Sequence, residues 1–224
     1  MVSGRNGPLG PKGLREIHWG DPVAAAHTVL DEHLGPRTEI SRNPHRSQAW
    51  AKDLVRAPGL LEPVQEAIGP NVAVENTFLV IKWPGEDFEV PWHQDGIDDR
   101  IELDPQRSVS AWLALTNAPP GSGCLYVVPC SQRRGYLPYH LEDDTGAGRG
   151  RAQAADVPDG LVGTPLTCMA GQGVLMDVRL LHRSGSNRVR GVRIGLNIRY
   201  VAPGGIQTLD GSTPKLDPVS GTGW

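Results

Sequence analysis

Two histidines and one aspartate have the types and spacing to share a metal ion. His93 and Asp95 stand two residues apart after an apolar run. In extended backbone, residues two apart face the same side, so both can point at one ion. His182, just after a later apolar run, supplies a third ligand. Two imidazoles and one carboxylate form the facial triad that leaves positions open on Fe(II), so the sequence predicts a catalytic iron site with ligands His93, Asp95 and His182.

The order of these residues matters more than the His-x-Asp pair, because a histidine beside an aspartate is more often a surface pair than a ligand pair. Here the pair follows one strand-like segment, a distant histidine follows another, and a basic residue begins the next. Structural roles are favoured for the other histidines, which lie in the front part of the chain or in a long loop: His18, His27, His33, His45 and His140.

Arg193 lies eleven residues beyond His182 and begins a strand-like run that ends at Tyr200. Alternation places Ile194, Leu196 and Ile198 on the face opposite Arg193. A buried guanidinium is costly without a carboxylate, and its planar fork suits the distal carboxylate of 2-oxoglutarate. Two alternatives stay open at this stage. Arg193 could pair with an internal acid or face solvent, while Arg190 or Arg199 takes the anion.

The elements that must position these residues change in character along the chain. Asp21-Pro22 opens a helical segment that Gly35 closes, and two shorter helices are expected at Ser47–Ala57 and Leu60–Ile68. Later apolar runs are short and β-branched, which predicts strands in an antiparallel sandwich or barrel: Thr77–Trp83, Val109–Leu115, Leu125–Val128, Gly173–Val178 and Val192–Val201. The expected fold is mainly β with flanking helices.

We expect one domain over residues 1–224, divided into a helical front part (1–70), a β core (71–202) and a C-terminal tail (203–224). Residues 136–173 form a long segment rich in Gly, Asp, Pro and Arg. Loops of that length are usually functional or disordered, so we interpret this one as a lid.

Composition narrows the class of partner. The formal net charge is -3 and the basic residues are scattered, which argues against nucleic acid and anionic membranes. No apolar stretch approaches the roughly 20 residues of a membrane span, and the polar start lacks a signal-peptide core. The three cysteines suggest neither disulfides nor a thiolate zinc site. We therefore expect a cytoplasmic protein with a small-molecule substrate; the oligomeric state is left open.

Several segments, taken in order, resemble the phytanoyl-CoA dioxygenase family: Thr77–Leu79, Trp92–Asp95, Ala111–Leu115, Gly123–Gln132 and His182–Ser184, followed by Arg193. The resemblance implies a double-stranded β-helix core of the jelly-roll, cupin-like type, with Fe(II), 2-oxoglutarate as cosubstrate, and O2. By the family pattern His93, Asp95 and His182 bind iron and Arg193 holds the far carboxylate of 2-oxoglutarate. Trp112, Gln94 and Ser184 would line or contact that cosubstrate, although Trp112 could equally be core and Ser184 could hold a turn.

Two details bear on the reaction. Where the family commonly has Pro-Gly-Ser-His, this chain has Pro129-Cys130-Ser131-Gln132, so a histidine near the substrate is lost or replaced by Gln132. Halogenating relatives have a small residue in place of the carboxylate, and Asp95 disfavours that outcome. Candidate substrate contacts, with solvated surface charge as the alternative, are Arg133, Arg134, Tyr136 and Arg179.

The predicted function is an oxidoreductase of secondary metabolism. It is a dioxygenase that hydroxylates an unactivated C–H bond of a small metabolite or natural-product intermediate, with release of succinate and CO2. Desaturation, cyclisation or epimerisation could follow from the same first step, the removal of a hydrogen atom from a C–H bond. The competing hypotheses are a non-catalytic cupin-like binding protein and a zinc or manganese enzyme that uses the same triad.

Overall fold

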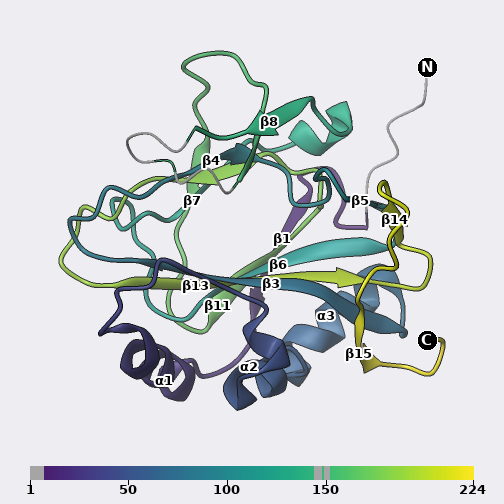
Figure 1. Ribbon diagram of the computed structural model, residues 1–224, viewed down its shortest axis with the longest axis horizontal. Helices are drawn as coiled ribbons and strands as arrows, with labels where there is room; N and C mark the ends of the chain where they lie inside the picture. Colours follow the sequence, from purple (N-terminus) through teal and green to yellow (C-terminus); the bar gives the residue numbers. More distant parts are fainter. Residues whose placement is uncertain (1–7, 144–147, 149–151) are drawn as a thin grey trace.

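Two facing antiparallel sheets form the centre of the molecule. The computed structural model describes residues 8–143, 148 and 152–224. Within them, the larger sheet has the strand order β1-β11-β6-β13-β3-β15, with β2 also paired to β3. The smaller sheet has the order β10-β7-β12-β4 and lies on the other side of the interior (Figure 1). This arrangement is the jelly-roll type of core that the sequence predicted.

The strands of the larger sheet are β1 (Leu14–His18), β2 (Ile40–Arg42), β3 (Val72–Lys82), β6 (Ser108–Ala114), β11 (Gln172–Met176), β13 (Arg193–Val201) and β15 (Asp217–Ser220). Those of the smaller sheet are β4 (Val90–His93), β7 (Leu125–Val127), β10 (Thr164–Leu166) and β12 (His182–Ser184). Two small pairs complete the set, β5 (Ile101–Leu103) with β14 (Ile206–Thr208) and β8 (Tyr139–Leu141) with β9 (Gln153–Ala155).

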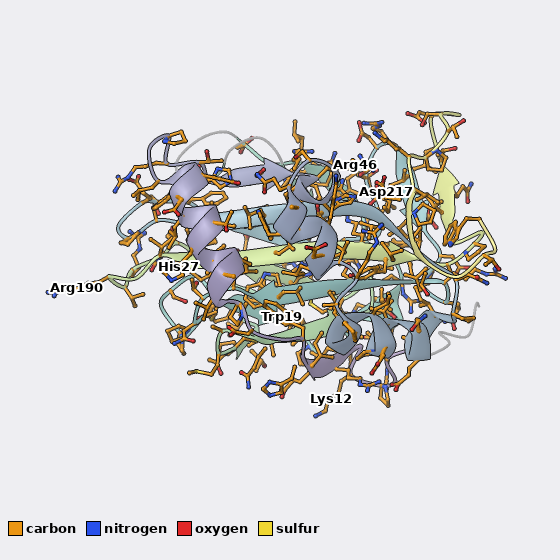
Figure 2. The ribbon with its side chains drawn as sticks, turned by 90° about the horizontal axis from the view of Figure 1, so that it is seen from below. Lys12, Trp19, His27, Arg46, Arg190 and Asp217 are labelled. Atoms are coloured by element: carbon orange, nitrogen blue, oxygen red, sulfur yellow. The ribbon has the colours of Figure 1, made fainter. Side chains whose placement is uncertain are left out.

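Alternation along the central strands divides the larger sheet into two faces. In β13, Ile194, Leu196 and Ile198 are fully buried in the main hydrophobic cluster, whereas Arg193 and Asn197 face the interior between the sheets. Helices α1 (Val23–His33), α2 (Ala49–Leu54) and α3 (Pro58–Ile68) cover the apolar face (Figures 1 and 2). The polar face of the sheet is therefore left to line the site.

The expected helical front part needs a correction. Its three helices are present, but residues 1–70 also supply the edge strands β1 and β2 and the short 3-10 helix η1 (Pro44–Arg46). The tail likewise contributes β14 and β15. These strands have three to five residues each, and such short segments carry little periodicity of their own. Their pairing partners lie far away in the chain, so tertiary context determines them.

The segment predicted to be a lid contains regular structure. Strands β8 and β9 form a hairpin and β10 joins the smaller sheet beside β7. Between β7 and this segment lies the 3-10 helix η2 (Ser131–Arg134). Part of the lid prediction falls on residues 144–147 and 149–151, which lie outside the described residues, as do residues 1–7 at the polar start. No helix in the described parts of the chain is long and apolar enough to cross a membrane.

Candidate metal centre and cosubstrate pocket

His93, Asp95 and His182 converge at the edge where β4 and β12 pair. The two histidines are register partners across these strands, and Asp95 follows β4 by two residues. His93 Nε2 lies 3.7 Å from Asp95 Oδ1, and His182 Nε2 lies 3.8 Å from Asp95 Oδ2. The three ligand atoms lie within 4.8 Å of one another. Pairing of two strands distant in sequence thus brings the predicted triad to one point.

Backbone carbonyl groups orient both imidazole rings. Nδ1 of His93 donates to the Pro91 oxygen at 2.8 Å, and Nδ1 of His182 donates to the Leu180 oxygen at 3.0 Å. In the neutral tautomer that these contacts select, each Nε2 is free to bind a metal, and it faces Asp95. Burial and the nearby His182 lower the pKa of His93 to about 4, so this ring is neutral at physiological pH.

Asp95 is buried and is held as the carboxylate. The side-chain amide of Asn197 donates to both carboxylate oxygens at 3.0 Å. Burial acts to raise the pKa of Asp95, but the charges of His182 and Arg199 outweigh it and bring the pKa to about 2. A carboxylate between two imidazole nitrogens is a donor set suited to a divalent cation such as Fe(II).

Arg193 is buried beside the triad without a counter-ion. It is 1% exposed, and its Nη2 donates to the Gly123 carbonyl oxygen at 2.5 Å. Its Nε and Nη1 have no partner, and among residues 8–143, 148 and 152–224 no acidic side chain forms an ion pair with it. Burial lowers its pKa to about 10, so it stays charged at neutral pH. A bidentate carboxylate would satisfy these two donors.

The surroundings of three arginines bear on the two alternatives for Arg193. Arg193 pairs with no described acid and does not face solvent. Arg190 is exposed and points away from the molecule (Figure 2). Arg199 does line the pocket, but it lies 3.5 Å from Glu75 and 3.9 Å from Asp98. Among the described residues, Arg193 is thus the buried arginine of the pocket that has no acidic partner.

The three residues expected beside the cosubstrate are all placed at the pocket, with different roles. The guanidinium of Arg193 lies over the Trp112 ring, 5.7 Å from its centroid. Ser184 is buried and lines the same cavity. The Gln94 amide donates to the Gly135 and Arg179 carbonyl oxygens and accepts from the Leu137 N–H. Its hydrogen bonds thus tie two loops together, and its contact with the cosubstrate stays a prediction.

The candidate substrate contacts from the sequence lie elsewhere. Arg133 and Arg134 are exposed, Tyr136 donates to the Leu103 carbonyl oxygen, and Arg179 pairs with Asp177 at 2.8 Å. Gln132, considered as a replacement for the family histidine, is buried and donates to the Pro11 carbonyl oxygen. None of these five belongs to the described lining of the pocket, and the exposure of Arg133 and Arg134 fits the alternative of solvated surface charge.

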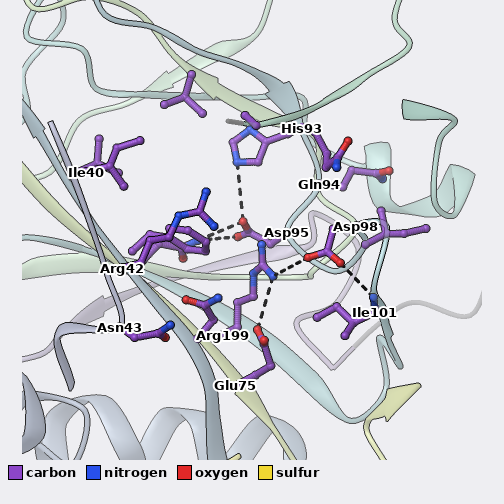
Figure 3. Close-up of a pocket in the computed structure, with 18 of the residues that line it drawn as sticks. Ile40, Arg42, Asn43, Glu75, His93, Gln94, Asp95, Asp98, Ile101 and Arg199 are labelled. Atoms are coloured by element: carbon purple, nitrogen blue, oxygen red, sulfur yellow. Dashed lines mark hydrogen bonds and ion pairs between the residues drawn. The ribbon is translucent and has the colours of Figure 1, made fainter. Parts of the chain in front are cut away.

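The pocket has a volume of about 510 Å³ and extends from the triad to a charged end (Figure 3). Apart from Arg199, the residues of this end were not predicted from the sequence. Its lining there includes Arg42, Glu75, Asn76, Asp98 and Arg199. One signal was available, because Arg199 is six residues beyond Arg193 in the same alternating strand. The signal for Glu75 and Asp98 was absent, since each sits at an irregular point of the backbone.

A family model for phytanoyl-CoA dioxygenase (PhyH) matches residues 21–195. The chain belongs to the phytanoyl-CoA dioxygenase family. The peroxisomal phytanoyl-CoA dioxygenase of Homo sapiens is 25% identical over 153 residues, which cover 65% of this chain and 44% of the human protein. The alignment thus spans less than half of that relative. Fe(II) and 2-oxoglutarate, the expected cofactor and cosubstrate, agree with this family and with the His-Asp-His site.

Solved structures of non-heme oxygenases have the same fold as this chain. A non-heme monooxygenase, ThoJ, superposes with a TM-score of 0.79 at 22% identity, covering 96% of this chain and 83% of its own. The alpha ketoglutarate dependent carbocyclase SnoK from nogalamycin biosynthesis has a TM-score of 0.71 at 18% identity, with 95% and 94% covered. At these identities the likeness establishes a common fold.

Proposed function

We propose that this chain is an Fe(II)- and 2-oxoglutarate-dependent dioxygenase that hydroxylates an unactivated C–H bond of a small molecule. The observation that carries the proposal is Arg193, a fully buried guanidinium with two unmatched donors in the same pocket as the His-Asp-His cluster. A buried charge without a partner costs several kcal/mol, a cost that a bound carboxylate removes. The distal carboxylate of 2-oxoglutarate is such a group.

The residues present fit both groups. His93, Asp95 and His182 would hold Fe(II), and Arg193, stacked on Trp112, would hold the distal carboxylate. When bound, the iron and cosubstrate supply an oxidant from O2 as 2-oxoglutarate is converted to succinate and CO2. Asn197 keeps both oxygens of Asp95 in place through its amide.

The first test does not require the substrate. Apoprotein is reconstituted anaerobically with Fe(II) and 2-oxoglutarate, and the visible charge-transfer band of the chelated cosubstrate is recorded. We expect the band in the wild type, its loss in His182→Ala, and a much higher half-saturating 2-oxoglutarate concentration in Arg193→Ala. Arg15→Ala removes an exposed arginine that pairs with Glu66 and serves as the matched control. Bound iron without a band in the wild type would overturn the proposal in favour of a binding protein or other metal chemistry.

The outcome of oxidation has its own test once a substrate is found by stimulated succinate release. Hydroxylation predicts one oxygen atom from 18O2 in the product. A product that has lost two hydrogens and gained no oxygen would instead indicate desaturation or cyclisation, and unchanged composition would indicate epimerisation. The pocket volume of about 510 Å³ supports a small-molecule substrate. The cytoplasmic location and the lack of nucleic-acid and membrane partners stay predictions.

A further inference from the structure

The end of the pocket beyond Asp95 contains a compact polar group that the proposed iron and cosubstrate do not use. We call Glu75, Asn76, Asp98 and Arg199 the Arg199 subsite. All four line the pocket, and Figure 3 shows Arg199 reaching toward Glu75 and Asp98 beneath Asp95. Arg199 and Asn76 are register partners on β13 and β3, so their side chains stand side by side on the pocket face.

Two acids, Glu75 and Asp98, face the single cation of this subsite, Arg199. Arg199 Nη1 lies 3.5 Å from a Glu75 oxygen and 3.9 Å from an Asp98 oxygen. Asp98 also accepts the backbone N–H groups of Arg100 and Ile101. Burial raises the pKa of Glu75 and so shifts this carboxyl group toward its neutral form. A substrate anion would lie beside the two carboxyl groups, and a substrate cation beside the Arg199 guanidinium, at low dielectric, so the subsite favours a neutral group.

Two hydrogen-bonding atoms in the subsite are left unmatched. Arg199 is 9% exposed and its Nε donor has no partner, and the Asn76 Oδ1 acceptor is buried without one. A hydroxyl group can accept from Nε and donate to Oδ1 at once. The oxygen and nitrogen of the Asn76 amide can exchange places by rotation of the amide. A hydroxyl group can bind either atom, because it is both a donor and an acceptor. An alkyl chain would leave both atoms unsatisfied, at about 1–3 kcal/mol each.

We propose that the Arg199 subsite binds hydroxyl groups of a neutral polyol, such as a sugar or cyclitol, and that Asn76 and Arg199 select this class over acyl chains. The inference rests on the proposed function, since it names the substrate class of that site. Arg199 is two residues beyond Asn197, which holds Asp95, so the subsite lies roughly 7 Å along the strand from the metal support. The bound hydroxyl and the oxidised carbon would thus be about one sugar ring apart.

The experiment uses the anaerobic protein loaded with Fe(II) and 2-oxoglutarate, whose band must be present before any probe is added. The probes are myo-inositol and methyl β-D-glucopyranoside, with cyclohexanol and octanoate for comparison. Cyclohexanol has the carbon ring of inositol with a single hydroxyl. The measurement is the shift of the charge-transfer band and the probe concentration that produces half of it.

We expect both polyols to shift the band, and cyclohexanol and octanoate to leave it unchanged. Asn76→Leu should keep the band without probe and raise the half-saturating polyol concentration about tenfold, the effect of one buried hydrogen bond. Asn71→Leu, an asparagine just before β3 that binds backbone N–H groups of the tail, is the matched control. Asn76→Ala repeats the test should leucine prevent folding.

The outcomes separate the two proposals. A missing band without probe overturns the proposed function itself. With the band present, the polyol inference is overturned if neither polyol shifts it, if cyclohexanol or octanoate shifts it instead, or if both Asn76 variants respond to polyols as the wild type does.

Discussion

Arg193 and Arg199 occupy one strand and face the same pocket, yet their surroundings differ. Both are nearly inaccessible to solvent, at 1% and 9% exposure. Arg199 has Glu75 and Asp98 beside it, and these acids with Asp95 outweigh burial and raise its pKa. Arg193 has a single carbonyl partner, and burial lowers its pKa to about 10. Both arginines carry a positive charge. Acidic side chains compensate the charge of Arg199, whereas the charge of Arg193 has no acidic partner among the described residues.

This difference separates two kinds of recognition. An unmatched buried charge gains most from an ion of opposite sign, which is what a dicarboxylate cosubstrate brings. An arginine whose charge is already compensated by acids contributes mainly its free N–H groups, which select a ligand by hydrogen bonding. The pocket can therefore bind an anionic cosubstrate and a neutral substrate side by side, with Asn197 and the metal ligands between them.

The largest expected effect comes from Arg193→Met. We expect the dissociation constant of 2-oxoglutarate to rise on the order of 100-fold or more, because truncating one partner of a buried charge pair costs about 2–5 kcal/mol. The free energy of unfolding of the apoprotein should stay equal or increase, since an apolar chain replaces an unpaired buried charge. Anaerobic calorimetry with Fe(II) measures the first quantity and urea denaturation the second. A large loss of apoprotein stability would show that Arg193 has a structural partner.

Arg199→Met should show the opposite pattern. Removing this cation leaves Glu75 and Asp98 without it, and we expect the apoprotein to lose about 3 kcal/mol of unfolding free energy. The dissociation constant of 2-oxoglutarate should change little. The double variant Glu75→Gln/Arg199→Met should recover part of the stability, because it removes an acid together with its counter-ion. Additive losses in this cycle would mean that the pair is not coupled.

The contrast also explains which residues the sequence could predict. His93 and Asp95 are near neighbours in sequence, and His182 and Arg193 follow recognisable strands, so local spacing was sufficient to propose them. Alternation in β13 correctly placed its isoleucines and leucine in the core and Arg193 on the opposite face. Position in the chain argued against the other five histidines as ligands.

The Arg199 subsite could not be predicted in the same way. Glu75 sits where the β3–β13 register shifts, so strict alternation does not give its direction. Asp98 lies in a turn and reaches Arg199 only after strands far apart in sequence have paired. Arg179 was a candidate substrate contact because it lies near His182 in sequence, but its side chain pairs with Asp177 and does not line the pocket. Nearness in sequence was a poor guide to nearness in the pocket.

Asn197 stands between the two arginines and provides the next test. Its amide donates to both oxygens of Asp95, so Asn197→Ala should let the carboxylate turn and should weaken Fe(II) binding about tenfold or somewhat more. Competition with a colorimetric chelator under anaerobic conditions measures this affinity. Asn71→Ala is the control, because Asn71 binds the tail and does not line the pocket. An unchanged Fe(II) affinity would mean that Asp95 is oriented without Asn197.

The smallest expected effect comes from Gly195→Ala, which tests how closely the Trp112 ring and the Arg193 guanidinium are packed. A Cβ at this position would lie 2.7 Å from a Trp112 ring carbon and 3.0 Å from Arg193 Nη1, so the indole must shift. Overpacking of this kind costs about 1 kcal/mol of unfolding free energy. Because Arg193 lies over Trp112, the dissociation constant of 2-oxoglutarate should rise about threefold, while Fe(II) affinity and polyol binding at the Arg199 subsite stay unchanged. If polyol binding weakened as much as cosubstrate binding, the two ends of the pocket would be coupled through the sheet, and their division into a charged and a neutral end would be wrong.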